Sequence, residues 1–203
     1  MKSLSEIETV SKRSSKAAGF SWGVAEEVGK NIRMLEMFGL SGIKNLNYYF
    51  RIRDKKKFEK LNIISKENVT NKLDFCPIIS GLSFLDQVRS LESLNEIKFK
   101  RIAYPLLFLP FISRASEIIG KRLQLELDNK VFLLNYNISI FSNSLNDGII
   151  ESGKDVLIKF IDNKDLFEEN EWRELYKLSE NTFVEENDSL KQGGAGAGLT
   201  DND

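Results

Sequence analysis

The fold depends on residues 104–111, Tyr-Pro-Leu-Leu-Phe-Leu-Pro-Phe, the most apolar run of the chain. Pro110 either begins a helix at its first turn or kinks a helix that begins at Pro105. Apolar residues then recur with helical spacing as far as Ile119, and Gly120 is placed to end the helix. We therefore expect this segment to be the buried centre of the fold.

Three helices are predicted before this segment, each beginning at a serine (Ser3, Ser21 and Ser41). Apolar residues follow each serine at spacings of three and four, which is typical of an amphipathic helix. The first two helices are predicted to end at Gly19 and Gly39, since glycine commonly follows the last helical residue.

Glycines also occur inside the second predicted helix, at Gly23 and Gly29. A glycine in a helix costs about 1 kcal/mol relative to alanine. We expect the first two helices to approach each other closely at these positions. A ligand lying against the helix is the alternative.

After residue 120 the apolar period changes from helical to two, which indicates strands. Strands are predicted at 97–102, 123–127, 131–134 and 156–161, with a tight turn at 128–129. A short helix is predicted at 83–91, and residues 171–176 are predicted to open a last helix. Helices first and a sheet later indicate an α+β fold, with N-terminal helices followed by a small, mainly antiparallel sheet with packing helices.

We expect a single α+β domain over residues 1–192. Its helical part covers about 1–60 and its mixed part about 71–186. Residues 193–203 form a Gly-rich acidic C-terminal tail.

The composition excludes several chemistries. The chain of 203 residues has no histidine, which rules out Ser-His-Asp and Cys-His nucleophile pairs and histidine-ligated zinc. One cysteine excludes an internal disulfide and a cysteine metal cluster. The net charge of -1 argues against a nucleic-acid partner. We assign no metal and no cofactor, and any catalysis would use carboxylate, lysine, tyrosine or the lone cysteine.

The N-terminus lacks the apolar segment of a signal peptide, and no stretch approaches the roughly 18 apolar residues of a membrane span. We therefore expect a cytoplasmic protein with no membrane partner.

The tail has two interpretations, a flexible spacer and a docking peptide. As a docking peptide, its glycines are slim enough for a narrow groove, Leu199 is an apolar anchor, and two aspartates form an acidic tip. The candidate binding residues of the tail are Gly196, Gly198, Leu199, Thr200, Asp201 and Asp203.

The body of the chain offers four further candidates, Trp22, Glu26, Glu27 and Tyr104. The two glutamates can pair with Lys30 and support the helix, or one of them can be an active-site carboxylate with a raised pKa beside Trp22. Tyr104 could line the mouth of a pocket.

Two other features are interpreted as structural. Cys76 lies between apolar neighbours, which favours a core position over a nucleophile. The charged run at 54–60, Asp-Lys-Lys-Lys-Phe-Glu-Lys, is typical of a solvated linker or helix end rather than a phosphate site.

Three separated motifs resemble one bacterial family of unknown function, domain of unknown function family 3726. They are residues 3–30, residues 103–111 and the tail at 194–203. The resemblance implies no activity. It does imply that the tail is a native part of the protein, which favours a docking role.

Two functions are therefore carried forward. The leading hypothesis is a non-catalytic binding or accessory protein that docks through its C-terminal Gly/Ala-rich acidic tail. The alternative is a histidine-independent small-molecule enzyme with a pocket near the second helix closed by the tail. A protein partner or a small-molecule ligand is compatible with either, and homo-oligomers remain open.

Overall fold

The computed structural model describes residues 2–70, 72–135, 139–142 and 148–182. Contacts divide the chain into two compact units, residues 1–163 and residues 164–203. The hydrophobic core lies entirely in the first unit. The sequence places a boundary at residue 192 because the glycine run begins there, whereas the contacts divide the chain soon after the last strand of the sheet.

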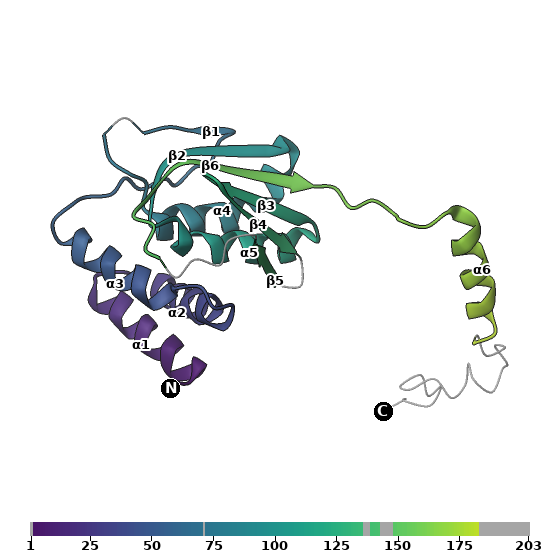
Figure 1. The fold of residues 1–203 in the computed structure, drawn as a ribbon, viewed down its shortest axis with the longest axis horizontal. Helices are drawn as coiled ribbons and strands as arrows, with labels where there is room; N and C mark the ends of the chain where they lie inside the picture. The colour runs from purple at the N-terminus through teal and green to yellow at the C-terminus, as the bar shows by residue number, and fades with distance from the viewer. Residues whose placement is uncertain (1, 71, 136–138, 143–147, 183–203) are drawn as a thin grey trace, which may run out of the picture. The chain divides into compact units, whose positions relative to one another are not determined.

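Three helices form the N-terminal part of the first unit (Figure 1), and their bounds are α1 Leu4–Ala17, α2 Trp22–Met37 and α3 Gly42–Arg53. Two predicted caps are confirmed. The Ser3 hydroxyl accepts a hydrogen bond from the backbone N–H of Glu6 at 3.1 Å. The Ser21 hydroxyl accepts one from the backbone N–H of Val24 at 3.3 Å. Each bond satisfies a donor that the first turn of a helix leaves free.

Helices α1 and α2 pack against each other at Gly29. A Cβ added there would lie 2.8 Å from the carbonyl oxygen of Glu8 and 3.1 Å from the Cβ of Lys12. A Cβ added at Gly23 would meet no atom within 4 Å. The predicted close approach is thus confirmed at Gly29 and wrong at Gly23, where the first turn of α2 has open space around it.

Alanine substitutions at these two glycines should have opposite effects. Gly29→Ala should destabilise the protein by about 1–3 kcal/mol, because its Cβ overlaps rigid backbone. Gly23→Ala should be neutral or stabilising by up to about 1 kcal/mol, since the helix gains propensity without a clash. Urea unfolding of both variants gives the comparison. Equal destabilisation by both would contradict this packing.

The predicted buried centre is confirmed, and it comprises the 3-10 helix η2 Pro105–Leu107 and the helix α5 Leu109–Ile119. Phe108 and Leu109 are fully buried. Pro110 lies in the first turn of α5, so it begins this helix and does not kink a longer one. Gly120 follows α5 with a φ of 65°, a left-handed conformation that glycine adopts without strain.

A further helix precedes the sheet, α4 Pro77–Leu91. It begins six residues earlier than the predicted helix at 83–91. Pro77 is its first residue, a position where the missing N–H costs nothing. The sulfur of Cys76 caps the helix, accepting from the backbone N–H of Ile79 at 3.5 Å. The capping role of a cysteine explains why the sequence pattern missed this start.

Within the described residues the strands form one six-stranded sheet in the order β1-β2-β6-β3-β4-β5. Their bounds are β1 Glu67–Asn68, β2 Glu96–Ala103, β3 Arg122–Leu127, β4 Lys130–Asn135, β5 Ser139–Ser142 and β6 Ser152–Ile161. β1 and β2 pair in parallel, and all other pairs are antiparallel. The predicted α+β class and the turn at 128–129 are confirmed. β1 and β5 were not predicted, because both are short and lack a clear alternation.

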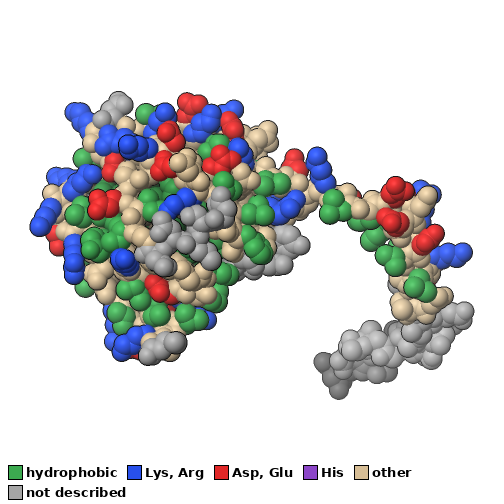
Figure 2. Space-filling view, in the orientation of Figure 1, with side chains coloured by type: hydrophobic (Ala, Val, Ile, Leu, Met, Phe, Trp, Pro, Cys, Tyr) green, Lys and Arg blue, Asp and Glu red, His purple; other side chains and the backbone are tan. Residues whose placement is uncertain are grey.

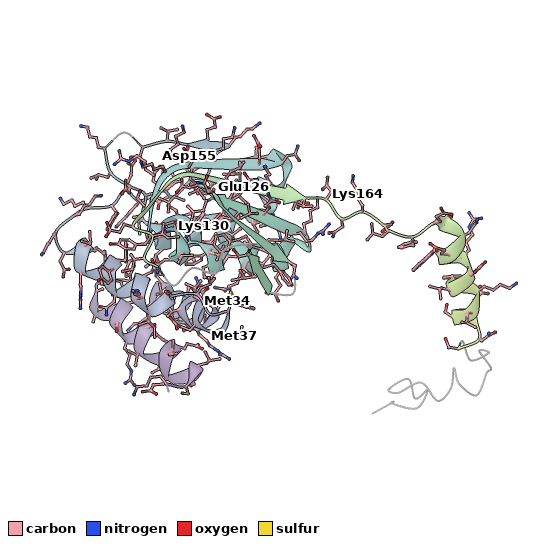
Figure 3. The ribbon with its side chains drawn as sticks, in the orientation of Figure 1. Met34, Met37, Glu126, Lys130, Asp155 and Lys164 are labelled. Carbon is pink, nitrogen blue, oxygen red and sulfur yellow. The ribbon has the colours of Figure 1, made fainter. Side chains whose placement is uncertain are left out.

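The alternation of β3 shows the two faces of the sheet. Leu123, Leu125 and Leu127 are buried in the core. The residues between them point to the other face, where Glu126, labelled in Figure 3, accepts a hydrogen bond from Lys159 of β6 at 2.6 Å. The sheet is therefore covered by helices on one face and carries ion pairs on the other.

The first unit has three layers. Figure 1 shows α4 and α5 between the sheet and the N-terminal helices α1–α3. Contacts of α5 with β3 and β4 on one side and with α2 on the other agree with this arrangement. The middle layer is buried from both sides, which explains the apolar character of residues 104–111.

The second unit begins at Lys164, labelled in Figure 3, and its helix is α6 Glu169–Glu180. The predicted helix opening at 171–176 is confirmed and extends further at both ends. The candidate tail residues, Gly196, Gly198, Leu199, Thr200, Asp201 and Asp203, lie outside the described residues. No helix in the described part of the chain combines the length and the apolar character needed to cross a membrane.

Candidate functional site

The carboxylates of α2 lie in a network of ion pairs. Glu26 contacts Lys12 of α1 at 3.1 Å and Lys30 of its own helix at 3.2 Å. Glu27 contacts Lys30 at 3.1 Å and also pairs with Arg114 of α5. The predicted pairing with Lys30 is confirmed, and the tertiary partners Lys12 and Arg114 are new. The network joins the outer helices to the middle layer.

These contacts keep both carboxylates ionised. Hydrogen bonds from Lys12 and Lys30 hold the pKa of Glu26 below its usual value. Burial opposes ionisation of Glu27, but hydrogen bonds from Arg114 and Lys30 outweigh it, so the Glu27 pKa is also lowered. A general acid near neutral pH needs a raised pKa, and both shifts run in the opposite direction. This arrangement favours the structural interpretation of the pair.

The Glu27 pair predicts a pH-dependent contribution to stability. Because the pKa of folded Glu27 is lowered, its stabilisation is present above about pH 4.5 and is lost as the pH falls through the folded value. Glu27→Gln should therefore cost about 1–3 kcal/mol at pH 7 and progressively less as the pH falls below about 4.5 through the lowered pKa of folded Glu27. Thermal unfolding across this pH range measures the difference. The exposed Glu26→Gln is the matched control and should cost less. A cost of Glu27→Gln that is independent of pH would contradict the assignment.

The other two body candidates, Trp22 and Tyr104, are uncharged and take no part in these ion pairs. Trp22 is the first residue of α2, is 58% exposed, and has the Lys16 ammonium 5.5 Å from its ring centre. Tyr104 is buried, has a left-handed backbone (φ 43°), and meets the Tyr49 ring edge-on at 5.9 Å. Burial raises the pKa of the Tyr104 hydroxyl. It is therefore a neutral core side chain at the start of η2.

The structure also shows an apolar groove that sequence reasoning missed. It lies between α1 and α3 and has a volume of about 260 Å³. Its apolar lining comprises Ile7, Val10, Ile43, Leu46 and Phe50. Val10 is 56% exposed. Helical spacing identified these residues as apolar stripes, but the crossing of the two helices decides which of them reach solvent.

A second missed surface is the apolar face of α6. Trp172, Leu175 and Tyr176 share one side of the helix at spacings of three and four, and none is buried. Figure 2 shows hydrophobic side chains on one side of α6 and charged side chains on the other. Phe167 stacks on Trp172 with 5.7 Å between ring centres, which enlarges the face. The predicted helix over 171–176 contains these residues, but an apolar stripe alone does not distinguish a core face from an exposed one.

Comparison with known families adds one finding. Residues 2–75 match the family described as "Protein of unknown function (DUF3726)". Over these residues the chain is therefore similar to DUF3726. The match confirms the predicted resemblance over α1, α2, α3 and β1, whereas the motifs at 103–111 and 194–203 lie beyond it. No curated protein and no solved structure matches this chain. The matched region, residues 2–75, contains the whole α1–α3 groove and the Glu26 and Glu27 carboxylates.

Proposed function

We propose that this protein is a non-catalytic binding protein that docks on a partner protein through residues 164–203, here called the C-terminal segment. The observation that supports this proposal most directly is the exposed amphipathic helix α6. A helix with a distinct apolar face and no buried residue is typical of a segment that lays this face into a groove. The tail at 193–203 follows in the same segment and supplies its acidic end.

The charges of the two units differ in sign. Residues 164–203 carry 11 acidic and 4 basic side chains, a net charge of -7. Residues 1–163 carry 25 basic and 19 acidic side chains, a net charge of +6. The balanced total conceals this asymmetry. An acidic segment selects a basic surface, since opposite charges steer association and like charges oppose it.

The partner is therefore a protein whose docking surface combines an apolar groove with a rim of lysine and arginine. The groove takes Trp172, Leu175 and Tyr176, and the rim faces the glutamates of α6. Local contacts prepare the helix for binding. The Glu171 carboxylate accepts a hydrogen bond from the backbone N–H of Glu168 at 2.7 Å, and Arg173 pairs with Glu169 at 3.1 Å.

The alternative function, a small-molecule enzyme with a pocket near α2, has weaker support. A version of it that uses a carboxylate as general acid needs a raised pKa, whereas the pKa values of Glu26 and Glu27 are both lowered. A cytoplasmic location is part of our proposal.

Substitutions on α6 test the docking face. The double variant Trp172→Ala with Leu175→Ala is expressed in cells that naturally contain the protein. Its complex with the partner should be at least about a hundredfold weaker than that of the unchanged protein, since each side chain contributes about 1.5–3 kcal/mol on burial. The matched control is Glu174→Ala with Lys177→Ala, which alters the polar face without changing the net charge. Light scattering gives the mass of the complex, and cross-linking with mass spectrometry maps the contact surface.

We expect cross-links from the C-terminal segment to a lysine- and arginine-rich surface, and a complex that weakens as salt is added. Loss of the complex with the polar-face control, or cross-links to an acidic surface, would contradict the proposal. A complex formed only by a second copy of the chain would overturn the assignment to a different partner protein.

Deletion of residues 193–203 tests the tail separately. If the tail docks, its removal should weaken the complex while leaving the melting temperature of the first unit unchanged, because the core lies within residues 1–163. Calorimetry and the same mass measurement provide both readouts. An unchanged complex after this deletion would restrict docking to α6 and reject the tail.

A further inference from the structure

A second cavity lies in the first unit, far along the sequence from the C-terminal segment. It has a volume of about 250 Å³ and lies where the end of α3, the basic run at 54–60 and the start of α4 meet. We name it the Tyr49 cavity after the residue at its floor. Its volume is slightly below the roughly 300–1,000 Å³ of sites for drug-sized ligands. It therefore suits a small molecule with a single ring.

The rim of the Tyr49 cavity is basic. Arg53, Lys56, Lys57 and Lys60 line it, and the described residues that line it include no carboxylate. Lys56 is neutralised by Asp74 at 3.2 Å. Arg53 donates to the backbone carbonyl of Ala18.

Lys57 and Lys60 differ from Lys56 and Arg53 in their surroundings. Within the described residues neither has a carboxylate at ion-pair distance. Two cations beside one cavity with no facing carboxylate make a site that favours an anion.

The floor of the cavity is aromatic and uncharged. Tyr49 stacks on Phe58 with 5.2 Å between ring centres, and its hydroxyl is 3.0 Å from the sulfur of Cys76. Burial raises the pKa of Tyr49 far above its ordinary value, so the phenol remains neutral. The Phe20 ring lies 4.2 Å from the guanidinium carbon of Arg53. Such a floor accepts a flat apolar group.

Backbone hydrogen bonds fix the basic run beside this floor. The N–H of Glu59 donates to the carbonyl of Asp74 at 3.0 Å, and the N–H of Cys76 donates to the carbonyl of Glu59 at 2.8 Å. This short pairing positions Phe58 and Lys60 on either side of Glu59. The run follows the end of α3, and its charged side chains are exposed, so the predicted solvated linker or helix end is confirmed. Four of its residues also line the cavity, which the sequence did not indicate.

We propose that the Tyr49 cavity binds a small organic anion, a phosphate or carboxylate group joined to a single aromatic ring. The ring lies on Tyr49 and Phe58, and the anionic group lies between Lys57 and Lys60. This binding site is independent of the C-terminal segment and goes beyond the docking function.

Phenyl phosphate is the probe that carries both features. Calorimetric titration of the full chain should give binding at least about tenfold tighter for phenyl phosphate than for inorganic phosphate or benzyl alcohol, each of which offers only one feature. The amide NMR signals of residues 53–60 and 76–79 should shift on binding. Lys57→Ala with Lys60→Ala should weaken binding by about tenfold at low salt, since two exposed charge contacts are lost.

The matched control removes the same charge elsewhere. Lys55→Ala with Lys66→Ala lowers the net charge equally, and neither residue lines the cavity. This control should retain the affinity of the unchanged protein. The proposal would be overturned if both double variants weakened binding equally, or if inorganic phosphate bound as tightly as phenyl phosphate. It would also be overturned if the NMR shifts were confined to other regions, or if calorimetry gave no heat at millimolar phenyl phosphate. Because this titration tests only the Tyr49 cavity, a negative result would not contradict the proposed docking function.

Discussion

The fold depends on the burial of Phe108 and its neighbours between the β-sheet on one side and the N-terminal helices on the other. Phe108 meets Phe99 of β2 edge-on at 5.2 Å and Phe84 of α4 edge-on at 6.2 Å. The ring of Phe111, in α5, lies over Gly81 of α4. A Cβ added to Gly81 would be only 2.2 Å from this ring. These contacts fix the distance between sheet and helices. Close packing of this kind leaves no room for an added side chain, so the glycine and the ring depend on each other.

The surfaces that we connect with function lie outside this centre. The Glu27–Arg114 pair attaches α2 to α5, and through α2 it holds α1 and the α1–α3 groove in place. The Tyr49 cavity forms where α3 ends against the start of α4. The apolar face of α6 belongs to the second unit. The first unit thus contains the groove and the cavity, and the second contains an amphipathic helix.

Local sequence signals predicted much of the fold. Serine caps, glycine ends and helical spacing located α1 and α2, because these features act within one or two turns of the chain. Alternation located β3 and β4 for the same reason. The start of α4 was missed because a cysteine caps it. The carboxylate pair of α2 was identified, but its partners Lys12 and Arg114 are 14 and 87 residues away in the chain, beyond any local pattern.

The sequence by itself determined the class of the fold, the buried centre at 104–111 and the absence of histidine chemistry. Composition and periodicity are properties of short segments, and they need no knowledge of what packs where. Only the tertiary structure decided that Gly29 is a contact and Gly23 is not, that Tyr104 is in the core, and that the basic run at 54–60 is the wall of a cavity. Each of these depends on which segments meet in space. That meeting is set by the joint packing of all the layers, which no single stretch of sequence contains.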